Sequence, residues 1–222
     1  MVSTTALLVV AKAPVPGLAK TRLCPPATHE EAAHIAAASL LDTLDAVVRT
    51  PGVQPVVAMT GDLNAAACST ELRDALCGWT FLAQRGDSFP ERLAAAHADT
   101  AAAHPGLPIV QIGMDTPQVT PELLAEACAA TRVADAALGL ADDGGWWVAG
   151  FRSAATACLL RGIPTSRNDT GARTLAALHA AGLRVAPLPE LSDVDTMADA
   201  LRVADSLPRS RFAASLPAGC RR

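Results

Sequence analysis

Seven apolar runs of strand length recur along the chain, and helical patterns separate most of them. The runs cover residues 6–11, 54–59, 79–84, 108–113, 134–141, 146–151 and 183–188. Such an alternation is typical of a mostly parallel sheet flanked by helices, because the crossover between two parallel strands is long enough to form a helix. The sequence therefore predicts an α/β fold.

Capping residues mark several helix starts. A Ser or Thr with Glu three positions later fits a capping box, and Thr followed by Pro fits an N-cap with proline at the first helical position. The boxes are Thr28 with Glu31 and Ser88 with Glu91, and the proline pair is Thr120 with Pro121. Helices are therefore expected to begin directly after these caps.

The fifth and sixth runs are separated only by residues 142–145, which are two aspartates and two glycines. Four residues cannot hold a crossover helix, and an Asp-Gly step is typical of a tight antiparallel turn. One strand is therefore expected to run against its neighbours, so that the sheet is mixed.

With 222 residues, half of them hydrophobic, the chain can bury a sizeable core. No stretch rich in Pro, Gly or Ser divides it, so we expect one domain over residues 1–206. From Leu207 onward the sequence lacks periodicity, and residues 207–222 are expected to form a mobile tail.

Composition excludes several classes of protein. The net charge is −4, and basic residues cluster only in the first loop and the last fifteen positions, which argues against nucleic acid as a partner. No segment approaches the roughly 18 apolar residues of a membrane span. The six cysteines include no C-x-x-C pair, so we expect reduced thiols in a cytoplasmic protein. The oligomeric state is left open.

The loop after the first run, residues 11–23, has the character of a phosphate site. It carries Lys12, Lys20 and Arg22, and Gly17 allows close approach of the backbone to an anion. A Walker A loop would need glycines where Ala13 and Ala19 stand, so a P-loop NTPase is excluded. The alternative is a solvated basic loop that binds nothing.

Asp115 follows the fourth run directly, where a buried strand emerges at its C-terminal end. Ligands of open α/β sheets bind at that edge, and an aspartate there can hold a divalent cation beside the phosphate loop. Alternatively, Asp115 caps a turn before Thr116.

A second acidic cluster holds Asp193 and Asp195, before a helix expected to be capped by Thr196 with Asp199. We expect these two side chains to face opposite ways, so that one would point to the site and the other would serve the turn. An irregular backbone would let both coordinate metal, and a pure capping segment would need neither.

The hairpin tip leads into two indoles, Trp146 and Trp147, whose alternation would bury one and leave the other as an apolar wall beside a ligand. The loop at residues 84–88 is a further candidate at the same edge, and Arg92, one helical turn beyond, is expected in a surface ion pair. The five histidines lie in helical stretches without ligand spacing and are expected to be structural.

Five stretches, residues 11–23, 41–44, 113–117, 143–147 and 193–196, together resemble a bacterial family of glycosyltransferase-like (rSAM/selenodomain-associated) transferases. That family belongs to the nucleotide-diphospho-sugar transferase superfamily with the GT-A fold. The same motif order is similar to guanylyltransferases that act on phospholactate or phosphoenolpyruvate. The resemblance implies a single Rossmann-like domain that binds a nucleotide, a divalent metal (Mg or Mn) and a small-molecule acceptor.

The resemblance also implies roles for individual residues. Nucleotide and phosphate binding would fall to Ala11, Lys12, Pro16, Gly17, Lys20 and Arg22. Metal binding would fall to Asp115, Asp193 and Asp195. Catalysis would fall to Lys20, Arg22 and Asp115, and acceptor contacts to Asp143, Gly144, Gly145 and Trp146.

Two departures from the family pattern matter. A glycosyltransferase D-x-D motif would need an acid at Gly113, and Trp146 and Trp147 stand where the family has tyrosines. The leading expectation is a metal-dependent glycosyltransferase that uses a nucleotide-sugar donor, which the family favours. The alternative is a nucleotidyltransferase that joins a nucleoside monophosphate from an NTP to a phosphorylated acceptor and releases pyrophosphate, which the basic loop favours. A non-catalytic nucleotide-binding module is the third interpretation.

Overall fold

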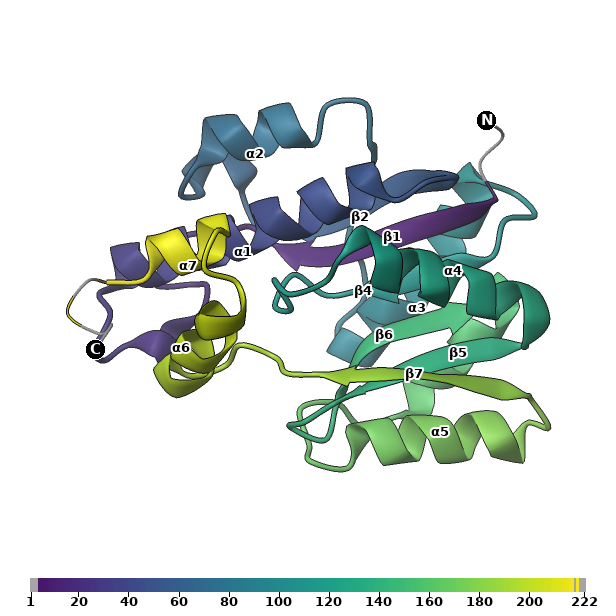
Figure 1. Ribbon diagram of the computed structural model, residues 1–222. Helices are drawn as coiled ribbons and strands as arrows, with labels where there is room; N and C mark the ends of the chain where they lie inside the picture. Colours follow the sequence, from purple (N-terminus) through teal and green to yellow (C-terminus); the bar gives the residue numbers. More distant parts are fainter. Residues whose placement is uncertain (1–3, 218, 220–222) are drawn as a thin grey trace.

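The computed structural model describes residues 4–217 and 219 (Figure 1). Its strands are β1 (Thr5–Lys12), β2 (Val53–Thr60), β3 (Thr80–Ala83), β4 (Ile109–Ile112), β5 (Ala136–Ala141), β6 (Trp146–Phe151) and β7 (Val185–Leu191). Its α-helices are α1 (His29–Arg49), α2 (Ser69–Ala75), α3 (Phe89–Ala103), α4 (Pro121–Val133), α5 (Thr170–Ala180), α6 (Met197–Ser206) and α7 (Arg211–Ser215). Shorter 3₁₀ segments are η1 (Thr21–Leu23), η2 (Leu63–Ala65) and η3 (Ala154–Gly162). Each expected strand has its counterpart, so the α/β prediction is confirmed.

The strands form one mixed sheet in the order β3-β2-β1-β4-β6-β5-β7. β1 pairs in parallel with β2 and β4, and β5 pairs in parallel with β7. β6 runs antiparallel to both β4 and β5, as the short connection predicts. Because β6 reverses direction between them, β4, β5 and β7 point the same way. The carboxyl ends of β1, β4 and β7 and the start of β6 therefore meet at one edge.

Helices cover both faces of the sheet (Figure 1). Alternate residues of β1 point to opposite faces, so that Leu7 and Val9 pack with α1, α2 and α4, whereas Leu8 and Val10 pack with α3, η3 and α5. The expected capping boxes at the starts of α1, α3 and α6 are present, as is the Thr120 cap of α4.

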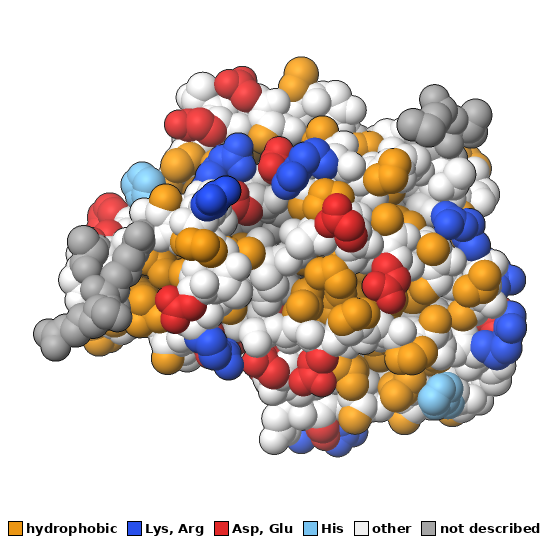
Figure 2. Space-filling model, viewed as in Figure 1, with side chains coloured by type: hydrophobic (Ala, Val, Ile, Leu, Met, Phe, Trp, Pro, Cys, Tyr) orange, Lys and Arg blue, Asp and Glu red, His pale blue; other side chains and the backbone are white. Residues whose placement is uncertain are grey.

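Surface charge, helix hydrophobicity and the state of the cysteines can be compared with what composition predicts. On the face shown in Figure 2, basic and acidic side chains are interspersed. No helix among residues 4–217 is long and apolar enough to cross a membrane. The five cysteines in the described part of the chain are free thiols, and Cys220 lies outside it.

The expectation of a mobile tail is wrong for residues 207–217. Arg211–Ser215 forms helix α7, and the Phe212 side chain is completely buried against α1 and α6. Asp42 of α1 accepts hydrogen bonds from the Phe212 amide (2.8 Å) and from Arg211. One buried aromatic ring anchors a segment too short to show periodicity. Of the remaining tail residues, 218 and 220–222 lie outside the described residues.

Replacing this anchor tests the docking of α7. Phe212→Ala should lower the free energy of unfolding by about 3 to 5 kcal/mol, because it removes a fully buried ring and leaves a cavity. Phe81→Ala, at a side chain that is 54% exposed, is the control and should cost far less. Urea unfolding measures both, and equal midpoints for the two variants would refute the docking.

Candidate active site

A cavity of about 630 Å³ lies at the carboxyl edge of the sheet. The ends of β1 and β4, the β5–β6 hairpin, the link after β7, the first turn of α3 and the loop before α5 all contribute to it. Its charged lining includes Lys12, Arg22, Asp115, Asp143, Asp193 and Asp195. A smaller neighbouring cavity of about 240 Å³ is also lined by Lys20. Charged residues far apart in sequence thus converge, as the sequence predicts.

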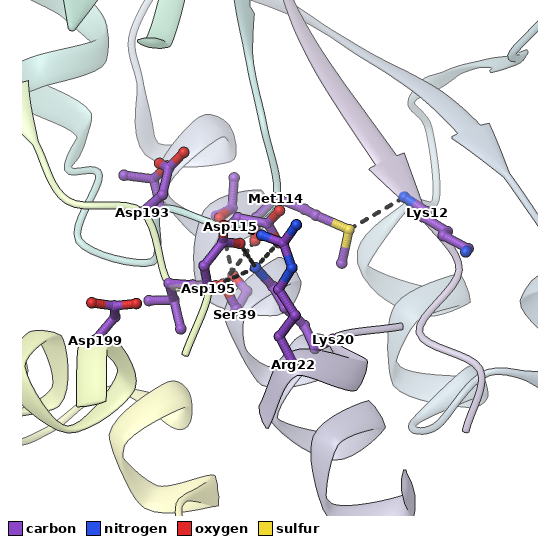
Figure 3. A network of polar contacts seen from close by, with 12 residues as sticks. Lys12, Lys20, Arg22, Ser39, Met114, Asp115, Asp193, Asp195 and Asp199 are labelled. Atoms are coloured by element: carbon purple, nitrogen blue, oxygen red, sulfur yellow. Dashed lines mark hydrogen bonds and ion pairs between the residues drawn. The ribbon is translucent and has the colours of Figure 1, made fainter. Parts of the chain in front are cut away.

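Lys20 lies at the centre of this convergence (Figure 3). Its Nζ is 3.0 Å from Asp115 Oδ1 and 3.5 Å from Asp195 Oδ1, and it also donates to the Val194 carbonyl. Burial alone would lower the pKa of Lys20, but the charge and hydrogen bond of Asp115, with Asp195 and Asp193, hold it above its ordinary value. Lys20 is therefore a charged ammonium already satisfied by protein oxygens.

Arg22 and Asp195 form the exposed side of the same network. Arg22 Nη1 lies 2.9 Å from Asp195 Oδ2, while most of the arginine side chain remains exposed. Asp195 thus contacts two cations from the first loop, Lys20 and Arg22. Little of its negative charge is left for a further cation, whereas the guanidinium of Arg22 can still reach a ligand in the cavity.

Asp193 differs from Asp195 in its surroundings. Its Oδ1 accepts a hydrogen bond from Thr116 Oγ1 at 3.0 Å, and it has no ion pair among the described residues. Burial, with the nearby charges of Asp115 and Asp143, raises the pKa of Asp193 to about 7 despite the Thr116 bond and Lys20. A buried carboxyl with this pKa would be stabilised in its charged form by a nearby cation.

Both later aspartates line the cavity, which decides between the alternatives for this segment. Between them, the buried Val194 donates its amide to the Asp115 carbonyl at 3.1 Å and turns its side chain into the core. Residues two positions apart share one face of an extended backbone, so Asp193 and Asp195 both face the cavity, and the expectation that they face opposite ways is wrong.

The remaining residues of the first loop divide into two groups. Ala11 and Lys12 line the large cavity, and Lys12 lies on the far side of Met114 from Lys20 (Figure 3). Pro16 and Gly17 line neither cavity. Gly17 has a φ of +75°, a conformation that glycine adopts readily, so the backbone of the turn accounts for this residue.

At the hairpin tip, Asp143, Gly145 and Trp146 line the cavity and Gly144 does not. A Cβ on Gly144 would lie 2.0 Å from the Asn168 carbonyl oxygen, so this glycine lets the loop before α5 pack onto the hairpin. Trp147 is buried and donates its Nε1 to the Pro189 carbonyl at 2.8 Å. The alternation expected for the two indoles is therefore present.

Arg92 is a cavity residue that sequence reasoning placed wrongly. It forms no ion pair within the described residues, and its Nε is buried without a hydrogen-bond partner there. Its guanidinium carbon lies 5.9 Å from the centre of the Phe89 ring, and both residues line the cavity. The expected surface ion pair is therefore absent, because the first turn of α3 faces the cavity.

Two side-chain amides with fixed orientations also line the cavity. Gln84 donates both hydrogens of its NH₂ group, to the Ala11 and Ala58 carbonyls at 2.8 and 2.9 Å, and its oxygen has no hydrogen-bond partner among the described residues. Gln111 pairs its oxygen with the buried His97 at 2.9 Å. Burial lowers the pKa of His97 to about 4, so this imidazole is neutral and structural.

Comparison with known proteins identifies the family. Residues 43–167 match the family model described as "Uncharacterized protein conserved in bacteria (DUF2064)", which is more than half of the chain. The chain belongs to this family. The match includes Arg92, Asp115 and the hairpin tip, whereas the first loop and the Asp193–Asp195 cluster lie outside it.

Individual relatives agree with this assignment. The chain is 32% identical over 114 residues to a phosphoenolpyruvate guanylyltransferase of Nocardia farcinica, a match that spans half of this chain and 49% of the relative. A crystal structure of a Desulfovibrio desulfuricans protein assigned as a nucleotide-diphospho-sugar transferase superposes with a TM-score of 0.82 at 29% identity, covering 96% of this chain and 94% of the other. The resemblance to GT-A-like nucleotidyl and sugar transferases is confirmed.

A more distant structure has the same fold. Rv0371C of Mycobacterium tuberculosis, in complex with manganese, superposes with a TM-score of 0.55 at 22% identity over 91% of this chain and 100% of the other. Among the described residues here, no three His, Cys, Asp or Glu side chains form a metal-binding group. The Lys20 ammonium lies between Asp115 and Asp195. It therefore keeps these two carboxylates from binding the same metal ion.

The buried His97 should make stability pH-dependent. Below pH 6.5 the unfolded chain binds a proton at this residue, whereas the folded chain binds it only near pH 4. Stability should therefore fall by about 3 kcal/mol as the pH drops from 6.5 to 4. Urea unfolding across this pH range should show a smaller fall in the free energy of unfolding for His97→Gln than for the wild-type protein. The exposed control His34→Gln should show the same fall as the wild-type protein. A wild-type fall in His97→Gln would contradict the assignment.

Proposed function

We propose that this protein is a metal-dependent nucleotidyltransferase, which joins a nucleoside monophosphate to a small phosphorylated acceptor and releases pyrophosphate. The observation that carries the proposal is the meeting of first-loop cations with carboxylates from two strand ends at one cavity. The name of the Nocardia farcinica relative, a phosphoenolpyruvate guanylyltransferase, supports this reaction class. That match spans about half of the relative, so the activity is inferred for this chain and not transferred whole.

Sugar transfer from a nucleotide sugar is the second candidate. The near full-length similarity to the Desulfovibrio desulfuricans protein favours it, as does the family resemblance. Two features favour nucleotide transfer. Gly113 supplies no second acid beside Asp115, and the cavity is lined by Lys12, Arg22 and two further arginines. A triphosphate donor and a phosphorylated acceptor carry more negative charge for these cations to neutralise than a nucleotide sugar does.

In this reaction the first loop would bind the donor. An oxygen of the acceptor phosphate attacks the α-phosphorus, and the bond from that phosphorus to the oxygen bridging it to the β-phosphorus breaks. The electron pair leaves with pyrophosphate, whose growing charge Lys12 and Arg22 would stabilise. Lys20 would be a positioning residue, because it holds Asp115 and Asp195 in place.

Asp115 and Asp193 are the residues that would hold a divalent metal. They come from two elements, line one cavity, and are electrostatically coupled, and Asp193 has no cationic partner of its own. Mg²⁺ is commonly bound by one or two carboxylates together with substrate phosphates, so two carboxylates fit this mode. When bound, the metal would neutralise charge on the departing pyrophosphate. The manganese complex of the Mycobacterium tuberculosis structure supports the choice of metal.

Thermal unfolding with nucleotides tests the donor site. A nucleoside triphosphate at about a hundred times its dissociation constant should stabilise the protein by about 2.7 kcal/mol, and only when Mg²⁺ or Mn²⁺ is present. Mass spectrometry of reactions with acceptors then separates the chemistries, since pyrophosphate marks nucleotide transfer and a free nucleoside diphosphate marks sugar transfer. Stabilisation that a chelator leaves unchanged would remove the metal from the proposal.

Substitution of the strand-end acid tests its role. Asp115→Asn should reduce turnover at least a hundredfold, because the amide keeps the size and the contact to Lys20 but lacks the charge needed for the metal. The fold should persist, since Lys20 keeps Asp195 and the Val194 carbonyl. Asp74→Asn, at an exposed position on α2, is the control. Wild-type turnover in Asp115→Asn would end the proposal.

A further inference from the structure

We propose that Arg92 and Arg167 form a subsite for an oxyanion of the acceptor, either a phosphate or a carboxylate. This inference rests on the proposed function and deepens it, because it assigns the second substrate to an anionic class and to specific side chains. The two arginines come from different elements, the first turn of α3 and the loop before α5, and line the same cavity. Neither belongs to the first loop.

Arg92 carries the inference furthest. Its buried Nε has no partner within the described residues, and a buried donor left without a partner is energetically unfavourable. The neighbouring Phe89 ring lies against its guanidinium and gives it an apolar support without neutralising its charge. A guanidinium held in this way presents a planar fork of N–H donors, which matches the two oxygens of a carboxylate or phosphate.

Arg167 is held at the cavity by the loop that contains it. Ser166 has a φ of +59°, a left-handed conformation that a non-glycine residue adopts only under local constraint. Asn168 packs on Gly144 of the hairpin tip, and the Gly171 amide donates to the Gly144 carbonyl at 2.8 Å. This loop is therefore fixed to the hairpin.

The charge of Arg167 is only partly neutralised. Its Nε lies 3.2 Å from Asp169, a carboxylate that Arg173 contacts more closely, at 2.7 Å. The two terminal nitrogens of Arg167 have no hydrogen-bond partner in the described part of the chain. They remain available to a ligand in the cavity.

The position of this pair favours the acceptor over the donor. Arg167 lies in the loop that packs on the hairpin tip, which borders the cavity away from the first loop. Donor phosphates would instead meet Lys12 and Arg22 of the first loop. A cavity of about 630 Å³ is within the range of small-molecule sites and has room for groups at both places.

Arginine footprinting on the full-length wild-type protein tests the subsite without any turnover. Phenylglyoxal modification, read by peptide mass spectrometry, should slow at least threefold at both Arg92 and Arg167 in the presence of inorganic phosphate or acetate. Arg184, exposed directly before β7, is the control and should react at the same rate throughout. Protection by phosphate alone indicates a phosphoryl group, and protection by acetate indicates a carboxylate. No protection at Arg92 and Arg167 overturns the subsite.

Variants then connect the subsite to the reaction. With phosphoenolpyruvate as the acceptor probe, Arg92→Met and Arg167→Met should each raise the acceptor KM at least tenfold and leave the donor KM within twofold. Arg184→Met should change neither, and Arg92→Lys should recover part of the loss. An equal rise in both KM values would overturn the acceptor assignment. Protection without any product from the wild-type protein would refute the proposed function and leave the anion subsite standing.

Discussion

The buried ammonium of Lys20 is the contact on which the geometry of the cleft depends. It joins three segments that are distant in sequence: the first loop, the turn after β4 through Asp115, and the link after β7 through Asp195 and the Val194 carbonyl. A buried charge is tolerated only when its partners neutralise it, and here the two carboxylates repel one another unless a cation lies between them. The Lys20 ammonium and the two carboxylates therefore hold one another in place. The shape of the cleft depends on the balance of their charges.

The sheet supplies the framework for this charge balance. Because β6 runs antiparallel between β4 and β5, the link after β7 emerges at the same edge as Asp115, although β7 is the outermost strand. The hydrogen bond from the Val194 amide to the Asp115 carbonyl then fixes the two links against each other. The same reversal brings Trp146 to this edge, at the start of β6. One strand reversal thus determines which side chains can meet.

Much of this arrangement was predictable from sequence. Apolar period and capping residues identify strands and helix starts, and the position of Asp115 directly after a buried run places it at the ligand edge. What escaped prediction depends on tertiary contacts. The docking of α7 rests on one ring, Phe212, and the exposure of Arg92 to the cavity depends on the orientation of α3. Gly144 serves packing with Asn168, a contact that no local pattern indicates.

The absence of an acid at position 113, together with the ion pairs of Lys20, limits the number of carboxylates that could bind a metal. A D-x-D pair brings two carboxylates to one strand end, whereas here Gly113 leaves Asp115 as the single acid there. Asp195 cannot replace the missing acid, because Lys20 and Arg22 already hold it. Asp193 has no ion pair among the described residues, and its burial makes its negative charge costly. On the proposed chemistry, two protein carboxylates are too few to saturate Mg²⁺, so phosphate oxygens of the substrate would complete its coordination. Metal and nucleotide would then bind together, and each would increase the affinity of the protein for the other.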